Sequence, residues 1–400
     1  MKLGFVLPRY GIEIHGGAES AARMLAERLA VSDGWSAEVF TSCAVDSQTW
    51  ADELPPGTFD VNGVTVHRFV SQPKDVATFH ARSIELFGAP STVTEADARA
   101  WIDLQGPVCP DVVDAAAASD CALVTFHPYL YWPTVYGVPR LAERAVLHPA
   151  THDEPPIFFP PYRQVFESPS GLVFWSDEER DLAQRRFPNI TTRPQLVLGI
   201  GVEAEPGHAA AARARIGVGD RPYVLCLGKV TEMKGTAALA RFFARYKELH
   251  PGPLTLVFAG PVADVPPEGL RDVLVAGPVD EETKWGLLRG ATALISPSAY
   301  ESLSLVVLEA WAAGIPVLVN GLCEPTRGHC VRSGGGLWYD GFASFDAALA
   351  RLAGDSRLAA HLAAAGRRYV DAFYRWPVVL ERYVRFLERV HERNQRVAVT

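Results

Sequence analysis

Two glutamates, Glu301 and Glu309, stand eight residues apart where an apolar strand is followed by a helix. The run 291–295 is predicted to be a buried strand, and the helix is predicted to end at Gly314. The first carboxylate therefore lies in a loop and the second lies within the helix. Carboxylates bind hydroxyl groups, and the positive end of a helix attracts an anion. This stretch predicts a site for a ligand with both hydroxyls and a phosphate, such as a sugar nucleotide.

Ser304 and two lysines are predicted to belong to the same site. Ser304 is expected to cap the helix, which would direct the helix N-terminus toward the ligand of Glu301. Lys229 and Lys234 lie in a loop between the strand 223–228 and a helix, where their charges would neutralise a departing diphosphate. For the acids and the lysines alike, ordinary solvated surface is the alternative. The position of the lysines just before a helix favours a ligand.

The first loop of the chain contains a glycine pair, Gly16 and Gly17, between an apolar strand at 3–7 and a helix. Glycines allow backbone amides to approach a phosphate at the start of a helix. A plain tight turn explains the same pair equally well.

Two histidines follow apolar strands in the first half of the chain. His127 and His152 both come directly after a strand-like run. Ligands of open α/β sheets bind beyond the carboxyl ends of the strands, so both side chains are expected where chemistry would occur. His148 lies inside the preceding apolar run and is predicted to be a core residue.

The elements that position these residues alternate between apolar strands and amphipathic helices, which predicts an α/β fold. Four hundred residues exceed one ordinary core, so we expect two domains, at 1–200 and 201–372, and a terminal segment at 373–400. An amphipathic helix is predicted within that segment, over 376–393.

Two further segments of the first half carry recognisable patterns. The residues around Asn62-Gly63 alternate between apolar and polar, which predicts a β-hairpin. The segment 71–105 is mixed and polar, with helical pieces and no clear strand. It is expected to be an insertion, either a plain surface cover or a wall of the pocket for a second substrate.

The composition excludes several classes of function. A net charge of −8 argues against a nucleic-acid partner. No apolar stretch reaches 18 residues, so no transmembrane segment is expected, and the N-terminal apolar run is predicted to be a strand rather than a signal peptide. The six cysteines lack metal-ligand spacing and suggest a reducing cytoplasm. No His, Cys and Asp cluster has that spacing either, so no metal is expected.

Taken together, the motifs resemble those of the retaining GT-B glycosyltransferases of family GT4, over nearly the whole chain. The resemblance is carried by four pieces in order: the loop 15–19, the strand end 150–154, the lysine loop 228–235 and the E-x7-E pair Glu301/Glu309. Each piece is weak alone, but their combination and spacing are specific.

The resemblance implies a GT-B fold, with two Rossmann-like domains that face one another across a cleft. Residues 1–200 would be the acceptor-side domain, 201–372 the donor domain, and 373–400 a helix that packs back on the first domain. It also implies a metal-independent hexosyltransferase without a cofactor. The donor would be a UDP- or GDP-linked sugar, and the acceptor a small molecule, a glycan or a protein.

The resemblance assigns roles to residues at matching positions. Gly16 and Gly17 would contact the donor phosphate, and Lys229 and Lys234 would bind the diphosphate. The main chain of Val279 would bind the base, and Glu309 would bind the ribose. The donor sugar would be held by Glu301 and by the backbone of Ser302, Leu303, Ser304 and Leu305, and His152 would contact the transferred sugar. His152 and Glu301 would therefore be the catalytic residues. Their tasks would be to bind sugar hydroxyls and stabilise charge.

Two positions depart from the family pattern. Lys229 stands where the family usually has Arg, which keeps the charge but loses bidentate phosphate binding. Leu303-Ser304 stands where the family often has Phe-Gly, a change expected to alter the choice of donor sugar. The alternative to an active transferase is a catalytically weakened homologue that binds a sugar nucleotide or a protein partner.

Overall fold

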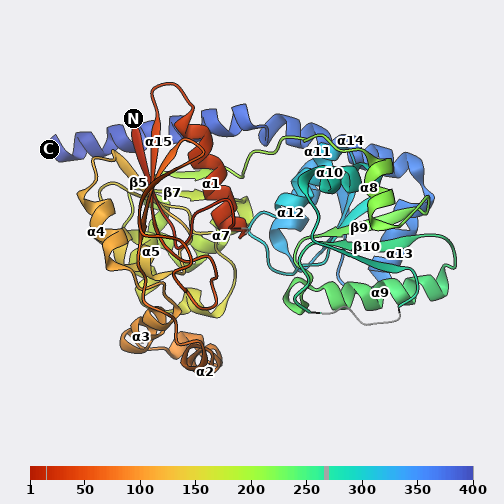
Figure 1. Cartoon of the computed structure of the whole chain (residues 1–400), viewed down its shortest axis with the longest axis horizontal. Coiled ribbons are helices and arrows are strands. Elements are labelled where there is room, and N and C mark those ends of the chain that lie inside the picture. The colour runs from red at the N-terminus through yellow and green to blue at the C-terminus, as the bar shows by residue number, and fades with distance from the viewer. Residues whose placement is uncertain (15, 265–269, 400) are drawn as a thin grey trace. The chain divides into compact units, whose positions relative to one another are not determined.

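The computed structural model describes residues 1–14, 16–264 and 270–399, so His15 of the first loop lies outside the described residues. The chain forms two compact units (Figure 1). The first unit is Met1–Gly199 together with the chain from Leu380 onward, and the second is Ile200–Val379. Each unit contains its own sheet with helices, as the alternating pattern of the sequence predicted.

The sheet of the first unit has the strand order β3-β4-β2-β1-β5-β6-β7-β8. Its strands are β1 Lys2–Val6, β2 Ser36–Ser42, β3 Gly57–Val61, β4 Val64–Phe69, β5 Leu123–Phe126, β6 Ala145–Leu147, β7 Gly171–Phe174 and β8 Gln195–Val197. Neighbouring strands are parallel except β3 and β4. The run β4-β2-β1-β5-β6-β7 has the doubly wound order 3-2-1-4-5-6.

The predicted hairpin and helical insertion are both present in this unit. β3 and β4 pair antiparallel across Asn62 and Gly63, whose φ angles of 53° and 81° match a type I′ turn. The insertion forms α2 Val76–Phe87, a 3-10 turn and α3 Glu95–Gln105. Trp101 of α3 is buried against the core of the unit.

The remaining helices of the first unit cover its sheet. They are α1 Gly17–Ala30, α4 Pro110–Ala118, α5 Trp132–Arg140, α6 Pro161–Glu167 and α7 Asp177–Arg186. The last helix, α15 Trp376–Val399, joins this unit from Leu380 onward. A Cβ on Gly171 of β7 would lie 3.0 Å from Val390 Cγ2, so a glycine is needed where α15 packs on the strand.

The sheet of the second unit is wholly parallel, in the order β11-β10-β9-β12-β13-β14. Its strands are β9 Tyr223–Leu227, β10 Thr255–Ala259, β11 Val273–Gly277, β12 Ala293–Ser296, β13 Val317–Asn320 and β14 Gly336–Tyr339. Numbered within the unit, this order is again 3-2-1-4-5-6. The chain therefore reverses its direction of winding between the neighbouring strands β9 and β12.

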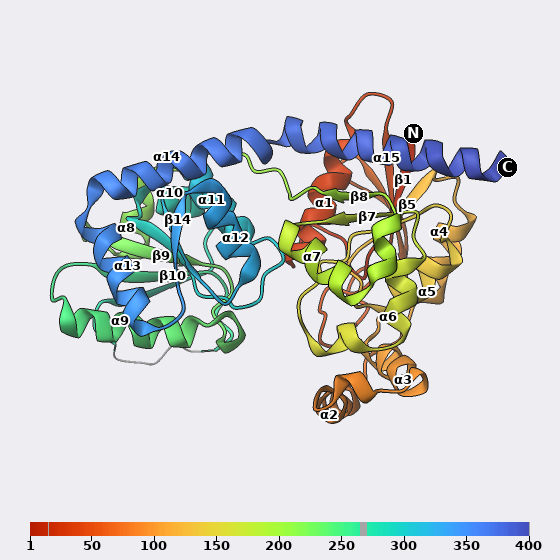
Figure 2. The same ribbon diagram turned by 180° about the vertical axis from the view of Figure 1, so that it is seen from behind.

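Helices cover both faces of the second sheet, as buried parallel strands require. They are α8 Ala209–Ile216, α9 Thr236–Leu249, α10 Glu281–Gly290, α11 Leu305–Ala313, α12 Glu324–Ser333, α13 Phe342–Gly354 and α14 Ser356–Phe373. Figures 1 and 2 show α9 and α13 on one face and α10 and α11 on the other. No described helix is long and apolar enough to cross a membrane.

Candidate functional site

The loops that follow β9 and β12 lie in contact at the point where the winding of the second sheet reverses. A Cβ on Gly235 would lie 2.7 Å from the carbonyl oxygen of Pro297, and Gly235 has a φ of 74°, so only glycine fits there. Asn320 Nδ2 at the end of β13 donates to the same carbonyl at 2.9 Å. Doubly wound sheets bind ligands at such a switch point.

Lys234 and Glu301, one from each loop, form an ion pair with Nζ and Oε1 at 2.7 Å. Lys234 ends a short 3-10 turn that the Thr231 side chain caps by accepting from Lys234 N at 3.2 Å. The lysine side chain is 45% exposed and the glutamate side chain 20%. Lys229 lies exposed in the same loop. The structure thus brings three predicted residues to one place.

Glu309 pairs with a different lysine. Its Oε1 lies 2.8 Å from Lys284 Nζ on α10, and Lys284 also contacts Glu281 at 2.7 Å. Burial raises the pKa of Glu309, which the positive charge of Lys284 opposes. Lys284 was missed at the sequence level, because one lysine in the polar pattern of a helix carries no distinguishing signal. Its role emerges only from the packing of α10 against α11.

Ser304 does not cap α11 with its side chain, so that prediction is wrong. The residue has a φ of 68°, in the left-handed region, whereas a capping serine needs extended backbone to bring its hydroxyl to the first-turn amides. The Ser304 hydroxyl is buried and lacks a hydrogen-bond partner within the described part of the chain. The first amides of α11 are thus not taken by this side chain.

Val279 and the segment Ser302–Leu305 occupy the same edge of the sheet as the lysine loop. Val279 lies half-buried between β11 and α10, next to Asp280, whose side chain caps α10 by accepting from Thr283 N at 2.9 Å. Leu303 is buried at the entrance to α11, and Ser302 is half-buried. Both segments follow the carboxyl ends of their strands.

In the first unit, an acid and an arginine lie beside the glycine pair. Gly17 begins α1, and Glu19 in its first turn is buried and hydrogen-bonded to Arg9 Nε at 3.1 Å. A Cβ on Gly16 would meet the carboxylate of Glu19 at 2.1 Å, whereas a Cβ on Gly17 would meet nothing within 4 Å. The carboxylate of Glu19 thus occupies the space beside Gly16 at the N-terminus of α1. The space beside Gly17 is open, so a ligand could approach the backbone there. Arg9 was not foreseen from the sequence.

Of the histidines, His152 is half-buried in the loop after β6, where its carbonyl accepts from Glu154 N at 2.9 Å. His127 is 1% exposed, and burial lowers its pKa to about 3. Its ring stacks at 4.1 Å on His148, and its Nε2 bonds to Thr125 Oγ1. The prediction that His127 faces a ligand is therefore wrong, because packing closes over it. His148 is the core residue that the sequence indicated.

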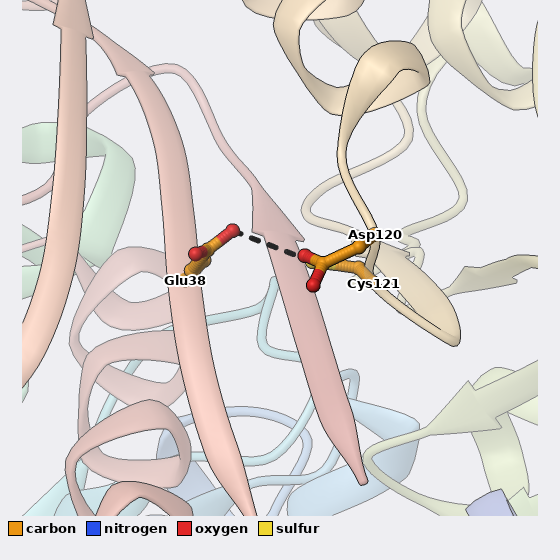
Figure 3. Close-up of side chains that lie close together, drawn as sticks. All are labelled: Glu38, Asp120 and Cys121. Atoms are coloured by element: carbon orange, nitrogen blue, oxygen red, sulfur yellow. Dashed lines mark hydrogen bonds between the residues drawn. The ribbon is translucent and has the colours of Figure 1, made fainter.

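One group of side chains in the first unit has the composition of a metal site. Glu38, Asp120 and Cys121 place ligand atoms within 4.8 Å of one another (Figure 3). Lys2 Nζ, however, donates to Glu38 at 3.1 Å and to Asp120 at 2.7 Å, and burial raises the pKa of the Cys121 thiol to about 11. The group lies at the amino ends of the strands, opposite His152. It is an ion-pair cluster with a lysine as its cation.

Comparison with known proteins identifies the kind of molecule that carries this site. Residues 221–355, which include both loops and Glu309, match the family model described as glycosyl transferases group 1. This match, over about a third of the chain, supports a GT-B glycosyltransferase of the GT4 type. The family resemblance found in the sequence is confirmed.

Two curated relatives show how far the sequence likeness of this chain extends. A D-inositol 3-phosphate glycosyltransferase of Acidothermus cellulolyticus is 33% identical over 150 residues, 32% of this chain and 34% of the relative. A GDP-mannose-dependent alpha-(1-6)-phosphatidylinositol monomannoside mannosyltransferase of Mycobacterium tuberculosis is 30% identical over 247 residues, 56% of this chain and 63% of the relative. The matched region thus spans between about a third and two thirds of the relatives' length.

Solved structures confirm the GT-B fold. Sucrose-phosphate synthase from Thermosynechococcus elongatus has a TM-score of 0.69 at 17% identity, over 97% of this chain and 98% of that chain. An E. coli structure described as trehalose-6-phosphate bound with UDP-2-fluoro glucose has a TM-score of 0.71 at 13% identity, over 98% and 99%. At these identities the likeness concerns the fold, which the sequence had predicted.

Proposed function

We propose that this glycosyltransferase moves a hexose-type sugar from a nucleotide-diphosphate donor to an acceptor, with retention and without a metal. The observation that carries the proposal is the contact of Lys234 with Glu301 at the switch point of the second unit, next to the helix that bears Glu309. Relatives support a UDP- or GDP-linked donor, because their names include UDP-2-fluoro glucose and GDP-mannose.

The donor would be bound by groups of opposite charge. In our proposal Lys229 and Lys234 neutralise the diphosphate, and their charges stabilise it as it departs. Glu301, released from Lys234, accepts hydrogen bonds from sugar hydroxyls together with the backbone of Ser302–Leu305. Glu309 accepts the ribose hydroxyls, as acids do in dinucleotide folds, and the main chain of Val279 meets the base.

His152 would act on the transferred sugar, as a group that binds a hydroxyl and stabilises charge. It would not be a nucleophile, and the departing phosphate would help to deprotonate the acceptor on the same face. Gly17, open to approach at the start of α1, would supply a backbone amide to the phosphate. The acceptor class stays open among small molecules, glycans and proteins. We propose the cytoplasm as the compartment, because all six cysteines are free thiols.

The role of Glu309 can be separated from its ion pair by a matched pair of variants. Lys284 contacts both Glu309 and Glu281, and the Glu281 side chain is 71% exposed. We expect Glu309→Gln to weaken UDP or GDP binding about tenfold or more, since a charged hydrogen bond to a hydroxyl is lost. Glu281→Gln removes an acid from the same lysine and should leave binding within twofold. Isothermal titration calorimetry measures both.

Turnover decides between an active enzyme and a weakened homologue. We expect release of nucleoside diphosphate from one of a panel of UDP- and GDP-sugars, with an acceptor mixture present, and loss of that release in Glu301→Gln. A wild-type protein that binds the nucleotides but turns over none of them would support the weakened homologue. Equal effects of Glu309→Gln and Glu281→Gln would refute the proposed ribose contact.

A further inference from the structure

The loop that carries His152 has a backbone conformation that its sequence does not favour. Ala150, two residues before His152, has a φ of 52°. This left-handed conformation costs free energy for any residue with a Cβ, and it persists only where the surroundings hold it. Something outside the loop must therefore fix the turn that leads into His152.

A buried carboxylate on α7 makes that contact. Glu179 is 1% exposed, and its Oε1 accepts a hydrogen bond from Thr151 N at 2.8 Å. Its Oε2 accepts from Trp175 N, at the end of β7, at 2.6 Å. Glu179 N in turn donates to Ser176 Oγ, the cap of α7, at 3.2 Å. One side chain thus ties the turn after β6 to the junction of β7 and α7.

The burial of Glu179 carries a cost in free energy. No cation pairs with its carboxylate anywhere in residues 1–14, 16–264 and 270–399, and burial raises its pKa to about 8 against the backbone hydrogen bonds that lower it. A buried ionisable group is expensive to keep. Because both oxygens accept from backbone amides on different segments, the cost is best explained by the geometry that the carboxylate imposes.

The other side of the loop is held by Tyr129. Tyr129 N donates to the carbonyl of Pro149 at 3.0 Å, and its hydroxyl donates to Glu154 Oε1 at 2.9 Å. His152 therefore lies between two attachment points, with Glu179 on the turn before it and Tyr129 bridging the loop ends. The half-buried imidazole is presented by a loop whose backbone has little freedom.

We propose that Glu179 is a positioning residue, which holds the Ala150-Thr151 turn so that His152 stands in place for glycosyl transfer. This inference rests on the proposed function, because it takes the role of His152 from there. It assigns to Glu179 no contact with substrate.

The test replaces Glu179 with Gln, which keeps the size but turns one accepting oxygen into an N–H donor that faces a backbone N–H. We expect kcat to fall about tenfold to a hundredfold, since a small misplacement of an active-site group costs that much. The Kd of UDP or GDP should stay within twofold, because the proposed contacts of Lys229, Lys234 and Glu309 with the nucleotide lie in the second unit and UDP and GDP lack the sugar that His152 would bind. Hydrogen exchange at the Thr151 amide should become faster.

Two controls separate positioning from folding. Glu178→Gln makes the same carboxyl-to-amide change one residue earlier in α7 and should leave kcat unchanged. Ser176→Ala removes the helix cap but keeps the Glu179 carboxylate, so it should lower the unfolding temperature with kcat within twofold. Should Glu179→Gln not fold, Glu179→Asp retains two acceptor oxygens on a shorter arm and is expected to lower kcat in the same way.

Wild-type turnover together with an unchanged kcat in a folded Glu179→Gln protein would overturn the positioning role alone. A fall in kcat no larger than that of Ser176→Ala would overturn it as well. If wild type turns over no nucleotide sugar, the proposed function fails instead. Hydrogen exchange at the Thr151 amide, compared between wild type and Glu179→Gln, then still shows whether Glu179 holds the turn, because this measurement needs no enzymatic turnover.

Discussion

At the scale of single residues, the site contains a serine in a backbone conformation that suits glycine. Ser304 has a φ of 68°, and its hydroxyl is buried with no hydrogen-bond partner in the described ranges of the chain. The sequence marked this position as a departure from the family pattern, which often has Gly there. The structure adds the physical reason: the turn into α11 needs a left-handed residue whichever side chain stands there.

Ser304→Gly is therefore expected to stabilise the protein by about 1 kcal/mol, because glycine adopts this conformation without strain. In a unit of this size that gain raises the unfolding temperature by about 2–4 °C, which differential scanning calorimetry measures. Ser304→Ala is the control, since it removes the buried hydroxyl but keeps the Cβ. A glycine variant no more stable than the alanine variant would show that the backbone is not strained.

A second prediction concerns His329, which is fully buried with Nδ1 at 3.1 Å from the Tyr369 hydroxyl. Burial lowers its pKa to about 3, so between pH 6.5 and 3 only the unfolded chain takes up the proton and wild-type stability falls. His329→Asn cannot lose stability in this way. The difference between the free energies of unfolding of wild type and His329→Asn should therefore shrink by about 1.4 kcal/mol per pH unit below 6.5. Urea unfolding at pH 7.5 and pH 5 measures this, and a constant deficit would contradict it.

At the scale of elements, the strand order places the candidate ligand-binding loops, and α15 packs on the sheet of the first unit. In the second unit, β9 and β12 are neighbours although 65 residues (228–292) lie between the end of β9 and the start of β12, so their following loops meet. In the first unit, α15 contributes the Tyr383 hydroxyl to His148 Nε2 at 2.9 Å. The histidine lies next to β6, the strand that leads to the His152 loop. The helix thus stabilises the strand behind a candidate catalytic residue.

Tyr383→Phe should destabilise the first unit by about 1–3 kcal/mol, because it leaves a buried imidazole nitrogen without a partner. Tyr300→Phe is the control, since Tyr300 is 62% exposed and lies in the second unit. Chemical denaturation followed by circular dichroism compares the two. Equal stability of the two variants would mean that the hydrogen bond adds nothing to the docking of α15.

At the scale of the whole molecule, the proposed functions divide between the two compact units. Lys229, Lys234, Glu301 and Glu309 all belong to Ile200–Val379, whereas His152 and its supporting Glu179 belong to the first unit. The nucleotide should therefore be bound mainly by the unit Ile200–Val379.

A nucleoside diphosphate at 100 times its Kd should stabilise the protein by about 2.7 kcal/mol, from mass action alone. Hydrogen exchange should slow in the loops 228–235 and 297–305, since the proposed phosphate and sugar contacts lie there. The loop 149–154 should not change, because UDP and GDP lack the transferred sugar. Protection confined to the first unit would contradict the proposed donor site.

The sequence alone determined what depends on local patterns. Strand and helix periods, the Asn62-Gly63 turn and the spacing of Glu301 and Glu309 are set by neighbouring residues, so the fold class and the glycosyltransferase motifs were readable directly. The tertiary structure decided which charges meet. Lys234 pairs with Glu301, Glu309 with Lys284, and the carboxylate of Glu179 meets an amide 28 residues away. These contacts depend on strand order and helix packing, which bring together residues that no local pattern links.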